Sequence, residues 1–205
     1  KILGVEIDVR DAGLAYGLGV LALGFAGLAI QGRPERRFWQ AAGIVYLGLP
    51  ALALTGLRAF PPEGHGFLII VGLFVVVWAT DTGALVAGNL IGGPRLAPRL
   101  SPAKTWAGTL GGSVLAAVAF AAYSGLLGQP VLLPALYAFA FSATAHCGDL
   151  FESFVKRRFG IKDSGTMIPG HGGALDRMDS TFAAACALAV LVFAFHINPI
   201  PGGHS

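Results

Sequence analysis

Residues 66–90 read GFLIIVGLFVVVWATDTGALVAGNL, an apolar stretch whose single ionisable side chain is Asp81. About 20 consecutive apolar residues, folded as a helix, cross the hydrocarbon core of a bilayer. In lipid such a segment must be helical, because a helix satisfies its backbone hydrogen bonds within the segment. The stretch therefore predicts a transmembrane helix.

Segments of the same character recur along the chain. Of its 205 residues, 55% are hydrophobic and 12% are charged, whereas about a quarter of the residues in a soluble domain are charged. A soluble protein of this length could not bury so many apolar segments. We therefore expect an all-α integral membrane protein, a polytopic helical bundle that forms one domain over residues 1–205. About six transmembrane helices are predicted, at residues 12–30, 38–57, 66–90, 106–127, 131–151 and 181–197.

Basic residues are concentrated in alternate loops of this bundle, which lie on the same side of the membrane. Cytoplasmic loops carry an excess of lysine and arginine. The first, third and fifth loops are therefore predicted to face the cytoplasm, and both ends of the chain to face away from it. The basic residues of these loops are Arg33, Arg36, Arg37, Arg95, Arg99, Lys104, Lys156, Arg157, Arg158, Lys162 and Arg177.

Ionisable side chains at membrane depth are costly and by default mark function. Asp81 lies in the third segment, and Asp149 lies at the cytoplasmic end of the fifth, in the sequence GDLFES. We interpret both aspartates as functional. An alternative, in which such acids lie among lipid headgroups or pair with an arginine, stays open, and it is strongest for Glu152.

Two cytoplasmic loops, about residues 91–105 and 152–180, are predicted to form an active site. Each combines basic residues with glycine and proline, which favour extended backbone and close approach to a ligand. A basic patch that contacts anionic lipid headgroups would need no site. The interleaved Asp163, Asp176 and Asp179 favour a divalent metal that holds phosphates, with lysine and arginine neutralising the remaining oxygens. The chemistry indicated is phosphoryl or nucleotidyl transfer to a lipid.

These residues resemble a known family. Residues 153–179, SFVKRRFGIKDSGTMIPGHGGALDRMD, are similar to the signature of the phosphatidate cytidylyltransferases, the CDP-diacylglycerol synthases. DTGALVAG from Asp81, LAPRLSPAKTWAGTLGG from Leu96 and GDLFES from Gly148 resemble the same family. The resemblance covers about residues 78–181. Family members usually have more transmembrane helices, and this chain starts at Lys1 without a signal-peptide pattern, so we expect N-terminal sequence to precede it.

The resemblance implies the reaction of CTP with phosphatidate to give CDP-diacylglycerol and pyrophosphate in phospholipid biosynthesis. It implies that Asp149 and Asp176 bind Mg²⁺, with room for a second cation. Phosphates would be held by Lys156, Arg157, Lys162 and Arg177, and the substrate site would be completed by Ser101, Lys104, Ser153, Gly172 and Gly173. The residues that would orient these groups are Asp81, Asp163, His171 and Asp179.

The resemblance also implies a homodimer in the bacterial inner membrane, in contact with membrane lipids and with no nucleic-acid partner. Two other functions remain open on the sequence. One is a CTP-dependent membrane lipid kinase that acts on a polyprenol or phytol. The other is a non-catalytic membrane protein that binds lipid in a basic pocket.

Overall fold

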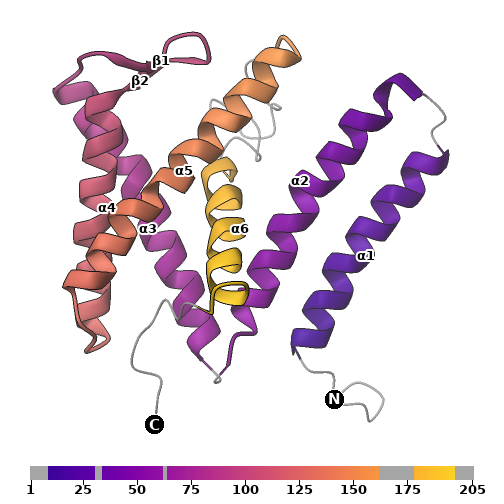
Figure 1. Cartoon of the computed structure of the whole chain (residues 1–205), viewed down its shortest axis with the longest axis horizontal. Coiled ribbons are helices and arrows are strands. Elements are labelled where there is room, and N and C mark those ends of the chain that lie inside the picture. The colour runs from indigo at the N-terminus through magenta and orange to yellow at the C-terminus, as the bar shows by residue number, and fades with distance from the viewer. Residues whose placement is uncertain (1–8, 31–33, 62–63, 162–177, 197–205) are drawn as a thin grey trace, which may run out of the picture.

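The computed structural model describes residues 9–30, 34–61, 64–161 and 178–196. Six helices and one small sheet make up these residues (Figure 1). In chain order the elements are α1 (Val9–Ile30), α2 (Pro34–Arg58), α3 (His65–Leu90), β1 (Arg95–Ala97), β2 (Ser101–Thr105), α4 (Trp106–Leu126), α5 (Leu132–Arg158) and α6 (Asp179–Phe193).

The helical membrane fold is confirmed, whereas the number of membrane-spanning helices is confirmed only in part. Among the described residues, three helical segments are long and apolar enough to cross a membrane: Arg37–Arg58, His65–Leu90 and Trp106–Leu126. The apolar helices Gly17–Leu28 and Asp179–Phe193 are shorter. Helix α5 is long, but its last ten residues carry five charged side chains. The six helices of the described residues therefore lie close to the six predicted segments. Three of them are long and apolar enough to be counted as membrane spans.

The prediction of an all-α fold is wrong at one place, the connection between α3 and α4. There β1 and β2 pair as an antiparallel hairpin, with Arg95 opposite Thr105 and Ala97 opposite Ser101. Pro94, Pro98 and Pro102 cannot supply backbone N–H groups to a helix, and each restricts the residue before it to extended conformations. The chain therefore forms a short hairpin directly before the start of α4 (Figure 1).

Helices α3 and α4 form a tightly packed antiparallel pair. A Cβ atom on Gly112 would lie 2.6 Å from the Thr80 carbonyl oxygen, and one on Gly83 would lie 2.8 Å from the Gly111 carbonyl oxygen. Small residues allow this close approach of helix backbones in membranes. Helix α5 crosses α4, where the Ser113 and Ser142 hydroxyls lie 2.6 Å apart.

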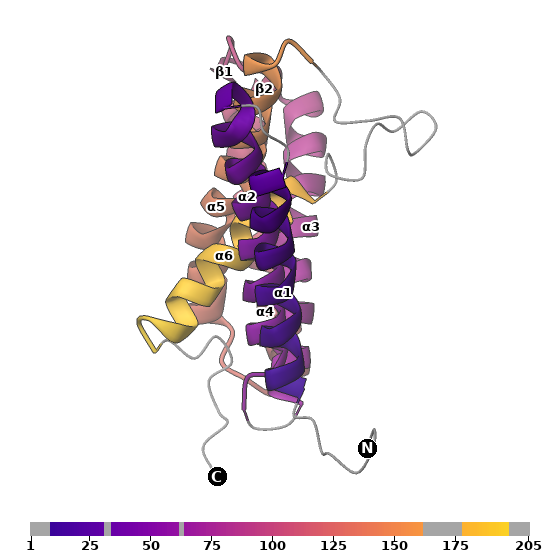
Figure 2. The same ribbon diagram turned by 90° about the vertical axis from the view of Figure 1, so that its right-hand side faces the viewer.

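Helix α6 occupies the middle of the bundle, between α5 and α2, whereas α1 packs on α2 at the edge (Figures 1 and 2). Ala184 and Ala185 of α6 are buried with Leu73 and Val77 of α3. The 15 residues of α6 span about 22 Å, less than the roughly 30 Å of a bilayer's hydrocarbon core. The first three residues of α6 are buried, so this short helix begins inside the bundle.

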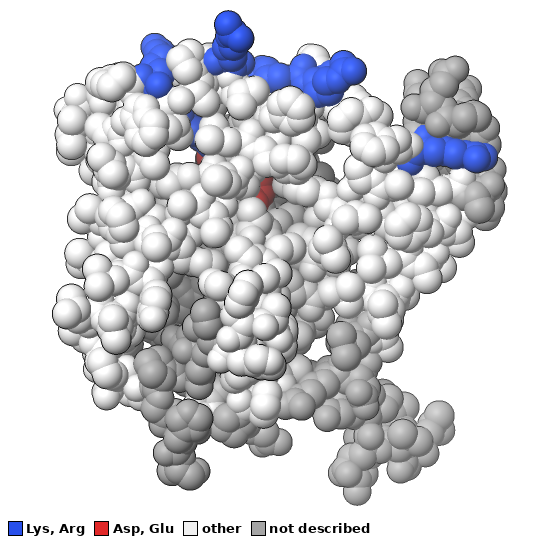
Figure 3. All heavy atoms as spheres, viewed as in Figure 1, with Lys and Arg blue, Asp and Glu red and all other residues white. Residues whose placement is uncertain are grey.

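Charge is distributed unequally between the two ends of the bundle. Exposed arginines mark the end formed by the hairpin and the C-terminus of α5, and Figure 3 shows the basic side chains along this rim. The flanks below carry exposed large hydrophobic side chains such as Leu23, Leu85 and Val118. Arg58 lies at the opposite end of α2. An apolar surface with charge at its ends is typical of an integral membrane protein.

Candidate functional site

Charged side chains from four elements gather beneath the basic rim. They are contributed by α3, β2, α5 and α6, and Figure 3 shows acidic side chains recessed below the rim. Asp81 lies nine residues before the end of α3 at Leu90, which places it about 14 Å along the helix from that end. The members of this group, which we call the charged cluster, are Asp81, Lys104, Asp149, Glu152, Lys156, Asp179 and the hydroxyl of Ser180.

The hairpin contributes Lys104 to the charged cluster. The Lys104 ammonium group forms an ion pair with the Asp149 carboxylate on α5. A second contact joins the same two elements, because Arg157 Nε donates a hydrogen bond of 3.4 Å to the Leu100 carbonyl oxygen. The structure thus brings residues 91–105 next to the C-terminal end of α5, which includes the first residues of the second predicted loop, residues 152–180. Ser101 and Ser153 are half-buried on β2 and α5.

The start of α6 lies against the middle of α3. Ser180 Oγ donates a hydrogen bond of 3.1 Å to Asp81 Oδ2, across 99 residues of sequence. The Ser180 backbone N–H donates to Asp179 Oδ1 at 2.6 Å. A carboxylate in the first turn of a helix is favoured by the helix dipole. Asp179 therefore stabilises a helix start that lies inside the protein.

Glu152 and Asp179 form the buried part of the charged cluster. Their carboxyl groups lie close enough to interact, and the two residues are only 7% and 8% exposed. Lys156 Nζ lies 3.1 Å from Glu152 Oε2, one helical turn along α5. The Tyr46 ring of α2 lies 6.0 Å from the rings of Phe151 and Phe182 and closes this region from the side.

Several predicted site residues lie outside the described residues. These are Lys162, Asp163, His171, Gly172, Gly173, Asp176 and Arg177. Of the two predicted metal ligands, Asp149 lies within the described residues and Asp176 lies outside them. Within the part of the chain that the structure describes, no group of three or more His, Cys, Asp or Glu side chains is arranged to hold a metal ion.

Two members of the charged cluster were not assigned a role by the sequence. For Glu152 the sequence leaves open a functional role, a position among lipid headgroups or pairing with an arginine, whereas in the structure it pairs with Lys156. Ser180 follows Asp179 directly, but nothing in the sequence indicated that its hydroxyl would meet Asp81. His146 Nε2 lies 3.2 Å from the Thr109 carbonyl oxygen, which places it in the α4–α5 interface.

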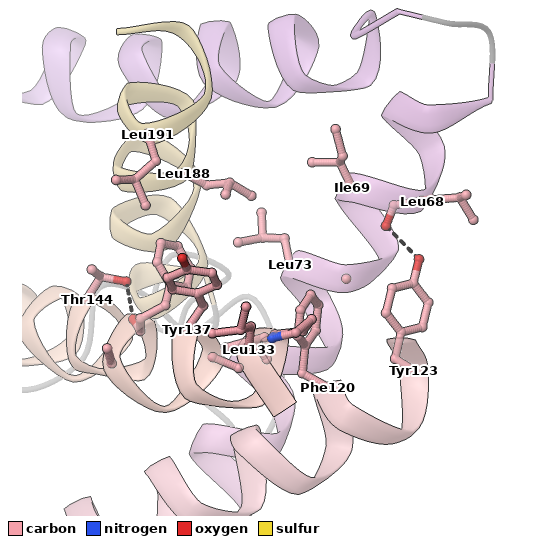
Figure 4. A pocket seen from close by; sticks show the side chains of 16 residues that line it. Leu68, Ile69, Leu73, Phe120, Tyr123, Leu133, Tyr137, Thr144, Leu188 and Leu191 are labelled. Atoms are coloured by element: carbon pink, nitrogen blue, oxygen red, sulfur yellow. Dashed lines mark hydrogen bonds between the residues drawn. The ribbon is translucent and has the colours of Figure 1, made fainter. Parts of the chain in front are cut away.

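An apolar cavity lies further along the bundle from the charged cluster (Figure 4). Its volume is about 620 Å³, and helices α3, α4, α5 and α6 form its walls with side chains such as Leu73, Leu133 and Leu188. Tyr123 Oη donates a hydrogen bond of 2.7 Å to the Leu68 carbonyl oxygen at one end of the cavity. The described residues that line it carry no charge.

Comparison with known proteins assigns the chain to a family. The profile of the Cytidylyltransferase family matches residues 13–195. A phosphatidate cytidylyltransferase of Brucella suis is 43% identical over 199 residues, which cover 94% of this chain and 71% of the relative. A protein of the same name from Brucella abortus is 45% identical over 186 residues, covering 88% of this chain and 66% of the relative.

A more distant relative gives the same result. The phosphatidate cytidylyltransferase of Helicobacter pylori strain J99 is 40% identical over 155 residues, covering 75% of this chain and 56% of the relative. The family profile covers all described members of the charged cluster. The chain therefore belongs to the phosphatidate cytidylyltransferase family of nucleotidyltransferase enzymes.

Proposed function

We propose that this protein transfers the cytidylyl group of CTP to phosphatidate, giving CDP-diacylglycerol and pyrophosphate at the cytoplasmic surface of a bacterial inner membrane. The observation that carries the proposal is the charged cluster itself. Lysines and carboxylates from α3, β2, α5 and α6 meet in a recess beneath a basic rim, in a protein whose flanks are apolar. The relatives named phosphatidate cytidylyltransferase supply the two substrates.

The reaction requires charge neutralisation more than proton transfer. A phosphate oxygen of phosphatidate forms a bond to the α-phosphorus of CTP, while the bond from that phosphorus to the bridging oxygen breaks and pyrophosphate leaves. The attacking oxygen is already anionic, so no strong base is needed. The main obstacle is the repulsion between two polyanions, which positioned cations remove.

The cations of the charged cluster suit this task. Lys104 and Lys156 reach the recess from the hairpin and from α5, and both are held by carboxylates. Arg157 lies at the rim, where its guanidinium also contacts the hairpin. We propose that these side chains, together with Lys162 and Arg177, hold the phosphates of CTP and phosphatidate.

Magnesium fits the chemistry of the remaining side chains, because it prefers carboxylate oxygens and substrate phosphates. In the proposal Asp149 and Asp176 bind it, with space for a second cation, and Asp81, Asp163, His171 and Asp179 orient the surrounding groups. Bound magnesium would act as a Lewis acid toward the phosphates. Asp149 now pairs with Lys104, so the same carboxylate would orient a lysine and bind the ion.

The position of the cluster suits substrates of two kinds. Water-soluble CTP would enter from the basic rim, and phosphatidate would enter from the apolar flanks. Basic residues at one end favour that end as the cytoplasmic one. A homodimer is part of the proposal through the family resemblance.

Purified protein incubated with CTP, phosphatidate and Mg²⁺, with and without a chelator, tests the proposal. The expected products are CDP-diacylglycerol and pyrophosphate, lost when the chelator is present. A lipid monophosphate and CDP, formed from a polyprenol or phytol, would show a lipid kinase instead. Lipid binding without any turnover of CTP would show a non-catalytic protein.

A further inference from the structure

Glu152 lies between Lys156 on α5 and Asp179 on α6. A carboxylate in the lipid headgroup region would instead be exposed to water. The Glu152 side chain accepts from Lys156, one turn later on α5. The same carboxyl group faces Asp179 at the start of α6, close enough to share a hydrogen bond with it. With 7% of its surface exposed, Glu152 is buried rather than solvated.

A buried carboxyl group is stable only when its hydrogen-bonding capacity is satisfied. Glu152 meets this requirement by contacting one residue on its own helix and one on α6. Two carboxyl groups can share a hydrogen bond when one of them carries a proton. Among the described residues, the other titratable groups that face the pair are Lys156, Tyr46 of α2 and, beside Asp179, Asp81 of α3.

We propose that Glu152 is a positioning residue that holds Lys156 in the orientation that binds the phosphates of CTP. The proposal rests on the proposed function, and it adds a residue to which that function assigned no role. Lysine carries a flexible side chain that is costly to immobilise. A carboxylate one turn away on the same helix fixes the ammonium group before the nucleotide arrives. Through Asp179, Glu152 also ties this lysine to α6.

The contact pattern predicts how replacements of Glu152 behave. Glutamine has the same size and offers an N–H toward Asp179 and an oxygen toward Lys156, so it preserves both contacts. Alanine removes both of them and leaves Lys156 without this support. Aspartate is one methylene shorter, so it cannot reach Lys156 and Asp179 together.

The experiment measures equilibrium CTP affinity in the presence of Mg²⁺, and separately CTP turnover with phosphatidate, on purified protein. For Glu152→Ala we expect CTP affinity to fall about ten- to a hundredfold, as for loss of a hydrogen bond to a charged group. For Glu152→Gln we expect an affinity within about threefold of wild type, as for a change that keeps its contacts. The matched control is Phe154→Ala, an exposed neighbour on α5, which should leave the affinity unchanged.

A double-mutant cycle separates positioning from general destabilisation. If Glu152 acts through Lys156, then Glu152→Ala should cause little further loss of CTP affinity in a Lys156→Ala background. Additive losses would overturn the proposal, as would a Glu152→Gln variant as defective as Glu152→Ala. If Glu152→Ala fails to fold, Glu152→Asp replaces it, and unchanged CTP affinity of that variant would also overturn the proposal.

The two readouts separate this inference from the proposed function. Wild-type protein that binds CTP but forms no CDP-diacylglycerol would contradict the proposed function, while the affinities of the variants still decide the role of Glu152. Wild-type protein that does not bind CTP would contradict both.

Discussion

Lys104 and Asp149 form an ion pair that joins the β1–β2 hairpin to α5. The two residues lie in segments separated by the whole of α4. Their contact places a cation from the hairpin beside a carboxylate from α5. The fold thus joins two parts of the charged cluster that are far apart in the sequence.

Asp149→Asn is expected to lower CTP turnover at least about a hundred- to a thousandfold, the effect of losing a group that stabilises transition-state charge. Asparagine keeps the shape of the side chain but loses the charge proposed to bind magnesium. The measurement is the rate of CDP-diacylglycerol formation, with the yield and melting temperature of the membrane-inserted protein as controls. Retained turnover would contradict the assignment of Asp149 as a metal ligand.

Lys104→Gln should weaken catalysis less than Asp149→Asn does. Glutamine can still hydrogen-bond to Asp149, but it brings no positive charge to the substrate phosphates. We expect kcat/KM for CTP to fall about ten- to a hundredfold, equivalent to one charged hydrogen bond. Lys104→Arg serves as the control, since it keeps the charge, and it should recover part of the loss. Equal activity of wild type and Lys104→Gln would remove Lys104 from the site.

Ser180→Ala tests the contact between α6 and α3. The change removes the hydrogen bond to Asp81 at a position that is 3% exposed. Loss of a buried hydrogen bond should destabilise the protein by about 1–3 kcal/mol. Thermal unfolding in detergent measures this. An unchanged melting temperature would show that the Ser180–Asp81 contact contributes nothing to stability.

Gly112→Ala tests the close packing of α3 and α4. A Cβ atom there would meet the Thr80 carbonyl oxygen at 2.6 Å, and relief of such overpacking typically costs about 1–3 kcal/mol. Gly43→Ala on α2 is the matched control, because a Cβ atom at Gly43 has no neighbour within 4 Å. A lower melting temperature is expected for Gly112→Ala alone. Equal stability of the two variants would show that α3 and α4 pack less closely at Gly112 than this distance indicates.

The orientation of the bundle can be measured by labelling single cysteines. Cys147 and Cys186 would first be replaced by alanine, and a cysteine would then be introduced at Arg99 on the hairpin or at Pro61 after α2. A membrane-impermeant maleimide applied to intact spheroplasts should label Pro61→Cys but should label Arg99→Cys only after lysis. The reverse pattern would place the charged cluster on the outer side of the membrane.

The helices could be predicted because an apolar segment in lipid can satisfy its backbone hydrogen bonds only as a helix. An apolar run such as residues 66–90 must satisfy its backbone internally, and α3 covers nearly the same residues. The hairpin was less accessible to prediction. Its prolines indicated extended backbone. Strand pairing, however, depends on the turn that places Arg95 opposite Thr105, and the hydrophobic periodicity of the sequence does not predict that turn.

The charged cluster was predictable in composition but not in its contacts. Charge at membrane depth, which is costly, indicated Asp81 and Asp149. The mixture of basic and acidic residues in two loops indicated Lys104 and Asp179. It could not show that Ser180 bonds Asp81 or that Glu152 joins Lys156 to Asp179. Those contacts depend on where α6 begins relative to α3 and α5, and this is set by packing of small residues such as Gly148 against Ala183.

The glycine contact between α3 and α4 has a mechanical consequence. Asp81 lies on α3, and Lys104 lies just before α4, so backbone contact fixes both residues on one rigid unit. Glu152 and Asp179 belong to α5 and α6, which meet that unit through side chains such as Ser142 and Ser180. Any widening of the recess would therefore have to move α5 or α6 away from the α3–α4 pair, which would stay fixed.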